Sequence, residues 1–155
     1  MLARLLVEHD HILKTLNLLE MQFMDLCRGG TPDYSLMRSI LVYIQEYPEQ
    51  IHHPLEDKIF SILLERVDEV KLIQELMAEH AELENETRKL GESARLLESG
   101  AGSKEEIKKQ LSSFLIKQRR HMYIEEETVH PLIESALTEE DWNYVQSAVP
   151  LYKGK

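Results

Sequence analysis

The apolar residues of this chain recur at steps of three and four, which is the period of an amphipathic helix. In the first stretch they occupy Leu2, Leu5, Leu6, Ile12, Leu13, Leu16, Leu19 and Phe23. His9 falls on the same stripe. Two glycines and Pro32 then interrupt the pattern. We therefore predict a helix over residues 2–27.

Three further stretches show the same period and predict helices over residues 35–64, 69–98 and 104–135, followed by a short closing helix over residues 139–148. The connections between them are short, and 155 residues favour a single domain. This pattern predicts an all-α fold, an up-down-up-down four-helix bundle with a short C-terminal helix.

Two local signals refine these elements. Ser103 and Glu106 have the spacing of a capping box, which is typical of a helix start. Pro48 and Pro54 lie inside the second predicted helix. Because proline lacks an amide donor and crowds the carbonyl group four residues earlier, we expect a kink or a break there.

Histidines followed four residues later by glutamate are frequent in this chain. On a helix this spacing places imidazole and carboxylate on one face, about one turn apart. The pairs are His52/Glu56, His80/Glu84, His121/Glu125 and His130/Glu134. In a glutamate-rich helical chain spacing alone does not select a metal site, so the depth of each histidine in the bundle has to decide.

Four histidines are expected at a similar depth. His9 lies 18 residues before the predicted end of its helix, and His52 lies 17 residues after the start of the next. In an antiparallel pair both would lie about 26 Å from the shared turn. His80 and His121 repeat this arrangement in the second half. His130 is more than two turns away from this level, so we predict a purely structural role for His130/Glu134.

The two halves of the chain resemble each other around these residues. His9 and His52 are 43 residues apart, and His80 and His121 are 41 residues apart. A glutamate precedes His9 and another precedes His80. We interpret this as a two-fold internal repeat in which each half supplies one single histidine and one His/Glu pair.

Four imidazoles and two carboxylates at one level of a core predict a bound cation, because buried charged groups without partners are strongly unfavourable. Imidazole with carboxylate suits iron, while zinc, manganese and copper also accept such ligands. Carboxylates from opposite halves favour a centre with two metal ions over a centre with one.

The stretch from His52 to Asp57 and the stretch from His121 to Glu126 resemble the helix-two and helix-four motifs of the hemerythrin-like family, the HHE cation-binding domains. The resemblance covers nearly the whole chain. It implies a non-haem centre of two iron ions bridged by Glu56 and Glu125. The ligands that it implies are His9, His52, Glu56, His80, His121 and Glu125.

The chain departs from the oxygen carriers of that family at Glu84, where they have a further histidine. In this respect it is more similar to the iron-sulfur repair and sensor branches of the family. Whether Glu84 reaches the metal stays open at this point.

Several neighbouring residues are alternatives to these ligands. His11 could replace His9, although His11 shares a face with Arg4 and Lys14. His53 could replace His52. We expect His53, Asp57 and Glu126 beside the ligands or in solvent. Tyr43, Tyr47 and Tyr123 could form hydrogen bonds within the pocket, but we favour aromatic packing for them.

Charge and composition exclude several functions. The net charge is −10 and no basic stripe offsets it, so neither nucleic acid nor an anionic membrane is expected as a partner. No apolar run approaches the roughly 20 residues that a membrane span needs. The chain has a single cysteine, Cys27, and no secretory signal, so we expect a cytoplasmic protein.

These expectations favour a metal-dependent ligand-binding protein over an enzyme. Six protein ligands for two ions leave coordination positions for oxygen, nitric oxide or peroxide. An apolar wall is expected from Leu13, Ile44, Leu55, Leu83 and Ile124. The alternatives are a di-iron enzyme acting on peroxide or in iron-sulfur cluster repair, and a metal-free helical interaction module. An electron donor or a downstream partner is not identified by the sequence.

Overall fold

The computed structural model describes residues 2–148, and every regular element in this part of the chain is helical. The predicted all-α class is confirmed. The α-helices are α1 (Leu2–Cys27), α2 (Tyr34–Glu46), α3 (His53–Leu64), α4 (Val70–Glu98), α5 (Lys104–Ile124), α6 (His130–Ala136) and α7 (Glu139–Ala148).

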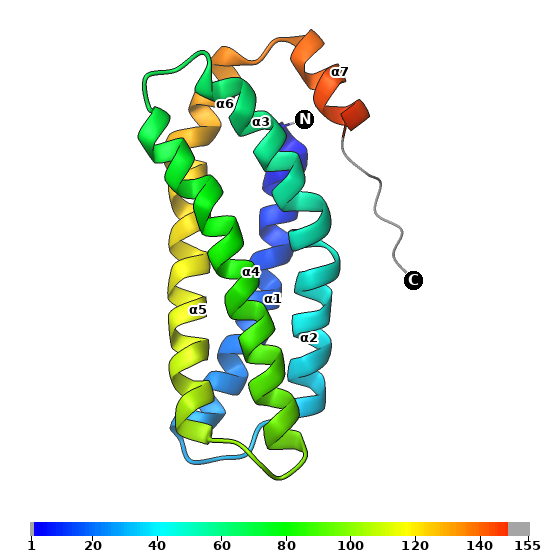
Figure 1. The fold of residues 1–155 in the computed structure, drawn as a ribbon, viewed down its shortest axis with the longest axis vertical. Coiled ribbons are helices and arrows are strands. Elements are labelled where there is room, and N and C mark those ends of the chain that lie inside the picture. Colours follow the sequence, from blue (N-terminus) through cyan, green and yellow to red (C-terminus); the bar gives the residue numbers. More distant parts are fainter. Residues whose placement is uncertain (1, 149–155) are drawn as a thin grey trace.

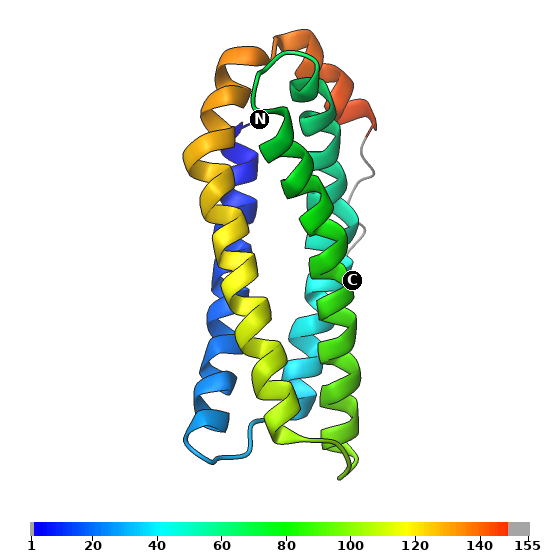
Figure 2. The ribbon, with the colours of Figure 1, turned by 60° about the vertical axis from the view of Figure 1, so that its left-hand side comes forward.

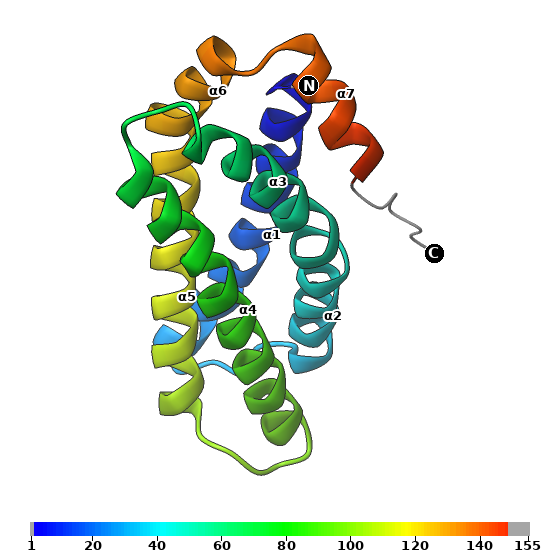
Figure 3. The same cartoon turned by 45° about the horizontal axis from the view of Figure 1, so that its top comes forward.

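The long helices lie side by side along the long axis of the molecule (Figures 1 and 2). α1 packs against α2 and α5, and α4 packs against the same two helices. The connections after α1 and α4 lie at one end, and the connection after α3 lies at the other (Figure 1). α7 lies at this second end and packs against α3 (Figure 3). The interior is thus enclosed by four helical columns: α1, α2 with α3, α4, and α5 with α6.

Two of the columns contain a π-helical turn, in which a backbone N–H group bonds the carbonyl group five residues earlier. η1 spans Pro48–His52 and η2 spans Glu125–Val129. The N–H group of His53 closes the first turn and the N–H group of His130 closes the second. In both cases the next residue is proline. A π turn followed by a His-Pro dipeptide therefore occurs once in each half of the chain.

The π turns correct two predicted helices. Residues 35–64 form α2, η1 and α3, so the interruption expected from the prolines is present and takes the form of a π turn. The predicted helix over residues 104–135 corresponds to α5, η2 and α6, and the π turn within it was not expected. Pro131 accounts for this, since a proline cannot donate to the carbonyl group four residues earlier and crowds it in a regular helix.

Side chains at the helix starts satisfy backbone N–H groups that have no partner within the helix. The Asp33 carboxylate accepts from the backbone of α2, and the Ser103 hydroxyl accepts from the N–H of Glu106, as the predicted cap requires. Thr138 and Asp141 cap α7 reciprocally, each side chain accepting from the other residue's backbone N–H. These caps fix where the columns begin.

The apolar core is divided into two clusters. The first surrounds α2 and the facing parts of α1, α4 and α5, and it includes Ile12, Leu16, Leu19, Ile44, Leu83, Leu111 and Phe114. The second lies towards α3, α6 and α7, and it includes Leu5, Leu55, Ile59, Phe60, Leu76, Val129 and Ile133. Along α1 the residues change from one cluster to the other on either side of His9, and along α4 they do so on either side of His80. The predicted ligands therefore lie between two apolar clusters.

Phe114 tests the first cluster, since its side chain is fully buried. Phe114→Ala should lower the free energy of unfolding by about 3–5 kcal/mol, because it removes apolar contacts and leaves a cavity. Denaturant unfolding followed by circular dichroism measures this. Ile116, on the same helix, is 65% exposed. Ile116→Ala should change the free energy by less than about 0.5 kcal/mol. Equal effects of the two substitutions would contradict this assignment of the core.

Candidate metal centre

The six side chains predicted as metal ligands meet in the interior of the bundle. None of them is more than 3% exposed. Each of the four columns contributes: His9 from α1, His52 from η1 with Glu56 from α3, His80 from α4, and His121 from α5 with Glu125 from η2. Both His/Glu pairs therefore lie at a π turn, and π turns are frequently found at functional sites.

The Glu56 carboxylate lies between histidines of both halves. Its Oε2 atom is 3.3 Å from Nε2 of His9 and 3.2 Å from Nε2 of His52. Its Oε1 atom is 3.2 Å from Nε2 of His80. One carboxylate oxygen thus faces the histidines of the first half, and the other faces the second half.

The Glu125 carboxylate has the corresponding arrangement. Its Oε1 atom is 3.4 Å from Nε2 of His9, and its Oε2 atom is 3.3 Å from Nε2 of His121. Within the described residues, the ligand atoms form two overlapping groups, each close enough to hold one cation. One contains His9, His52 and Glu56, and the other contains Glu56, His80, His121 and Glu125.

Most of the inward-facing atoms lack a hydrogen-bond partner within the described part of the chain. These atoms are Nε2 of His52, His80 and His121, Oε1 of Glu56, and both carboxylate oxygens of Glu125. They approach one another closely, but not in hydrogen-bond geometry. Buried polar atoms without partners are rare in folded proteins because their desolvation is costly. The donor set of imidazole nitrogens and carboxylate oxygens fits a cation in this position.

A second set of carboxylates contacts the outer nitrogens of the same histidines. Nδ1 of His52 is 2.7 Å from Glu8, and Nδ1 of His80 is 2.8 Å from Asp57. Nδ1 of His9 is 3.0 Å from Glu126.

The fourth histidine has a weaker version of this contact. Nδ1 of His121 is 3.6 Å from a carboxylate oxygen of Glu79, beyond hydrogen-bond distance. Since an ionised carboxylate only accepts, the outer nitrogen donates its N–H group and the inner nitrogen is the one that can bind a metal.

These contacts follow a two-fold pattern. The glutamate before the single histidine of each half contacts the paired histidine of the same half, as Glu8 contacts His52. The acid after the glutamate of each His/Glu pair contacts the single histidine of the other half, as Asp57 contacts His80. The proposed sequence repeat is thus accompanied by matching contacts around the cluster.

The carboxylates raise the pKa values of the four histidines against the effect of burial. Burial lowers the pKa of His9, but Glu125 and Glu56 raise it to about 11. In the same way, burial is outweighed by Asp57 and Glu56 at His80, where the pKa is raised to about 10. Neighbouring carboxylates outweigh burial at His52 and at His121 as well, and the pKa of each is raised to about 9. Without metal, protons thus take the place of the cation.

The pKa values of the neighbouring carboxylates are shifted in the opposite direction. Burial raises the pKa of Glu56, but His52, His80 and His9 hold it well below its usual value. Burial also raises the pKa of Glu8, and bonds from His52 and Tyr47 lower it to about 2. Both carboxylates are therefore ionised near neutral pH and available to a cation.

Tyr47 forms a hydrogen bond within the site, which the sequence allowed but did not favour. Its hydroxyl donates to Glu8 at 2.6 Å, and Arg4 donates to the same oxygen at 3.1 Å. Aromatic packing was expected, and Tyr47 does stack with Tyr43. Through Glu8, this hydrogen bond connects Tyr47 to His52. Tyr123, by contrast, is 64% exposed and does not take part in the cluster.

The structure separates the alternative ligands. His11 is exposed, whereas His9 is buried in the cluster. His53 is buried, but its ring stacks on His80 with the centroids 4.1 Å apart, and its Nδ1 atom lies 3.4 Å from Glu84. Glu84 therefore contacts His53, and neither residue belongs to the two groups of candidate ligand atoms.

The expectation that His130 lies away from the cluster is wrong. Its ring centroid is 5.3 Å from that of His9. In a regular helix, residues five apart are rotated by about 140°. The i to i+5 hydrogen bond of η2 changes this rotation, and both Glu125 and His130 lie next to His9. Burial and the neighbouring His9 lower the pKa of His130.

The predicted apolar wall borders the cluster on both sides. Ile44 and Leu83 belong to the first apolar cluster and Leu55 to the second, and all three are buried. Leu13 and Ile124 are partly buried and pack against these clusters. The polar atoms of the site are therefore enclosed by apolar side chains.

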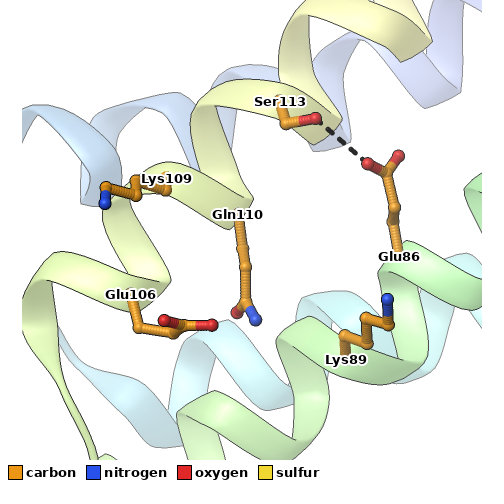
Figure 4. Close-up of a pocket in the computed structure, with 6 residues that line it drawn as sticks. All are labelled: Glu86, Lys89, Glu106, Lys109, Gln110 and Ser113. Carbon is orange, nitrogen blue, oxygen red and sulfur yellow. Dashed lines mark hydrogen bonds between the residues drawn. The ribbon is translucent and has the colours of Figure 1, made fainter.

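A surface pocket between α4 and α5 is separate from this cluster (Figure 4). Its volume is about 400 Å³, and its lining residues are Glu86, Lys89, Glu106, Lys109, Gln110 and Ser113. The Ser113 hydroxyl donates to Glu86 at 3.0 Å. The lining alternates in charge and contains none of the predicted ligands. Elsewhere on the surface, Cys27 is a free, exposed thiol.

Comparisons with known proteins agree with the geometry. The family model described as the hemerythrin HHE cation-binding domain matches residues 1–140. No curated protein and no solved structure matches the chain. Within residues 2–148, no helix is both long and apolar enough to cross a membrane.

The histidine pKa values predict how the metal-free protein responds to pH. A pKa raised from 6.5 to about 9 or above stabilises the fold below pH 6.5, and this stabilisation is lost as the pH rises through 9. Thermal unfolding of metal-free protein should therefore give a lower Tm at pH 9 than at pH 6.5. The double variant Glu56→Gln with Glu125→Gln lacks the two central carboxylates. Its Tm should therefore fall less between pH 6.5 and pH 9. A Tm that rises over this interval would contradict the prediction.

Glu126 tests the outer carboxylates. Glu126→Gln should weaken metal binding by about 10-fold to 100-fold, because it removes the charged acceptor that orients His9 and increases its basicity. Titration against a competing chelator measures the affinity. Glu127 is exposed and is the neighbouring residue. Glu127→Gln should leave the affinity unchanged, and equal losses in both variants would indicate a general effect of surface charge.

Proposed function

The chain belongs to the hemerythrin HHE cation-binding domain family, and from this premise we propose that it is a non-haem di-iron protein that binds or senses oxygen, nitric oxide or peroxide. The observation that carries the proposal is the convergence of four Nε2 atoms on two buried carboxylates. Ions other than iron would fit the same donor types, and the family match favours iron among them.

Two metal positions follow from the contacts. His9 and His52 would hold one ion, with Oε2 of Glu56 and Oε1 of Glu125. His80 and His121 would hold the other, with the remaining oxygen of each glutamate. Glu56 and Glu125 would therefore bridge the two ions. The overlap of the two ligand groups at Glu56 supports a bridge by this residue, and the approach of Glu125 Oε1 to His9 supports one by Glu125.

Iron in such a site supplies a redox-active Lewis acid with coordination positions that a small ligand can occupy. The chain's own residues prepare the site for it. The outer carboxylates hold the imidazole rings by Nδ1 and leave Nε2 directed inward. The histidines must release their extra protons on metal binding, so metal affinity should rise with pH. Leu55 and Leu83, both buried on either side of the site, limit the access of water.

The proposal also covers the helix topology, the cellular location and the partners of the protein. We describe residues 1–155 as one domain, an up-down-up-down four-helix bundle, and the four helical columns support this description (Figures 1 and 2). We place it in the cytoplasm, where the free thiol of Cys27 would remain reduced. Its partner is a diatomic or peroxide ligand, with neither nucleic acid nor membrane involved.

Metal analysis tests the proposal directly. Protein produced with added iron should contain close to two iron ions per chain and should show an absorption band from charge transfer to iron. Removal of the iron with a chelator should lower the Tm, because an ion that binds only the folded state stabilises it. Glu56→Ala with Glu125→Ala should retain less than one ion per chain.

Glu134 provides the matched control. It follows His130 at the same spacing as Glu125 follows His121, yet it is exposed. Glu134→Ala should retain the full iron content. Unchanged Tm after chelation, together with well below one metal ion per chain, would contradict the proposal and favour a metal-free interaction module.

Ligand binding can be separated from turnover by rapid mixing. Reduced, iron-loaded protein mixed with nitric oxide or peroxide should form a stable adduct with a changed absorption spectrum. Continued consumption of peroxide over many equivalents would instead indicate an enzyme.

A further inference from the structure

His130 is a buried histidine that the ligand set does not use. Its side chain is 5% exposed, and neither ring nitrogen has a hydrogen-bond partner among residues 2–148. A neutral imidazole has one N–H donor and one acceptor nitrogen. To bury both without a partner costs free energy comparable to one or more lost hydrogen bonds. The position therefore indicates a partner other than the residues that the structure describes.

The surroundings place this partner next to the metal centre. η2 turns His130 onto the same side as Glu125, and its ring lies 5.3 Å from that of His9. His130 belongs to neither group of candidate ligand atoms, which lie within 4.8 Å of one another. It is thus close to the first metal position, but it is not a member of the set that would hold the ion.

His53 shows what a histidine in the corresponding position looks like when it has a partner. His53 lies against His80 as His130 lies against His9, and each N–H group closes a π turn. Nδ1 of His53 contacts Glu84, which follows His80 by four residues.

In α1 the residue four positions after His9 is Leu13, which cannot accept a hydrogen bond. α1 thus lacks a carboxylate at the position from which Glu84 of α4 contacts His53.

We propose that His130 forms a hydrogen bond to a small exogenous ligand that occupies the metal centre on the His9 side. The ligand is a small molecule or anion with a hydrogen-bonding atom next to the atom that approaches the metal. The proposal rests on the di-iron function above and makes the two metal positions unequal. Among the described residues, only the first position has beside it a histidine outside the ligand set whose ring nitrogens both lack a hydrogen-bond partner, so the ligand binds there.

Azide is a suitable probe, because it is a small anion that accepts hydrogen bonds and changes the absorption of ferric non-haem centres on binding. His130→Phe keeps a buried ring and removes both polar atoms. In iron-loaded protein it should leave two iron ions per chain and weaken azide binding by about 5-fold to 10-fold, the size expected for one hydrogen bond. His130→Gln retains a donor and should recover most of the affinity. His11→Phe, at an exposed site, should bind azide as the parent does.

The iron-free protein provides a readout that is independent of the ligand. His130→Phe should raise the Tm of the iron-free fold, since it removes buried polar atoms that have no partner there. A lower Tm would show that the imidazole is already satisfied within the chain, and it would overturn the proposal.

The remaining outcomes separate this inference from the proposed function. Unchanged azide affinity in His130→Phe with full iron content overturns the role of His130 and leaves the di-iron centre intact. Loss of one iron ion in His130→Phe would make His130 a ligand of the metal and also overturns the inference. If the parent protein binds no metal, the proposed function fails and this inference fails with it.

Discussion

The structure depends on the burial of two carboxylates and four imidazoles between two apolar clusters. An ionised carboxylate in an apolar interior is strongly unfavourable unless opposite charge and hydrogen bonds surround it. Here Glu56 and Glu125 are each 1% exposed. Histidines from all four columns surround these carboxylates, and a second set of acidic residues contacts the outer nitrogens of the histidines. Either protons or metal ions can supply the positive charge, and the metal is the partner that also satisfies the unpaired lone pairs.

The two-fold pattern explains how one short chain builds such a site. Each half supplies a single histidine, a His/Glu pair and the acids adjacent to them. The outer contacts cross between helices, so that the rings of His9, His52 and His80 are each held by a residue from another column. The pattern is broken around Glu8 and His9. Arg4 and Tyr47 contact Glu8, and the ring nitrogens of His130, next to His9, have no hydrogen-bond partner within residues 2–148. An asymmetric centre of this kind suits a protein in which only one side receives a ligand.

The sequence predicted the convergence of the ligands because the rise of a helix is constant, so that equal distances from a shared turn bring residues to one level. It did not predict the outer acids Glu8 and Glu79. Each stands next to a histidine in the sequence but contacts a different one, and this depends on the rotation of one helix against another. The Glu-His dipeptides were visible as a repeat, and they were the signal that could have suggested a role.

His130 was missed for a related reason. A regular helical period places it on the far side from Glu125, and the period is broken by η2. The two His-Pro dipeptides, His53-Pro54 and His130-Pro131, were the available signal, since each follows a π turn. The prolines of the second helix predicted its interruption. By the same physical argument, Pro131 predicts the interruption at η2.

The central claim is that two metal ions lie between Glu56 and Glu125. Anomalous diffraction at the iron absorption edge, from crystals of iron-loaded protein, tests it most directly. The account predicts two peaks about 3.5–4 Å apart, one beside His9 and His52 and the other beside His80 and His121. No peak within this cluster, with iron found elsewhere on the protein, would contradict it.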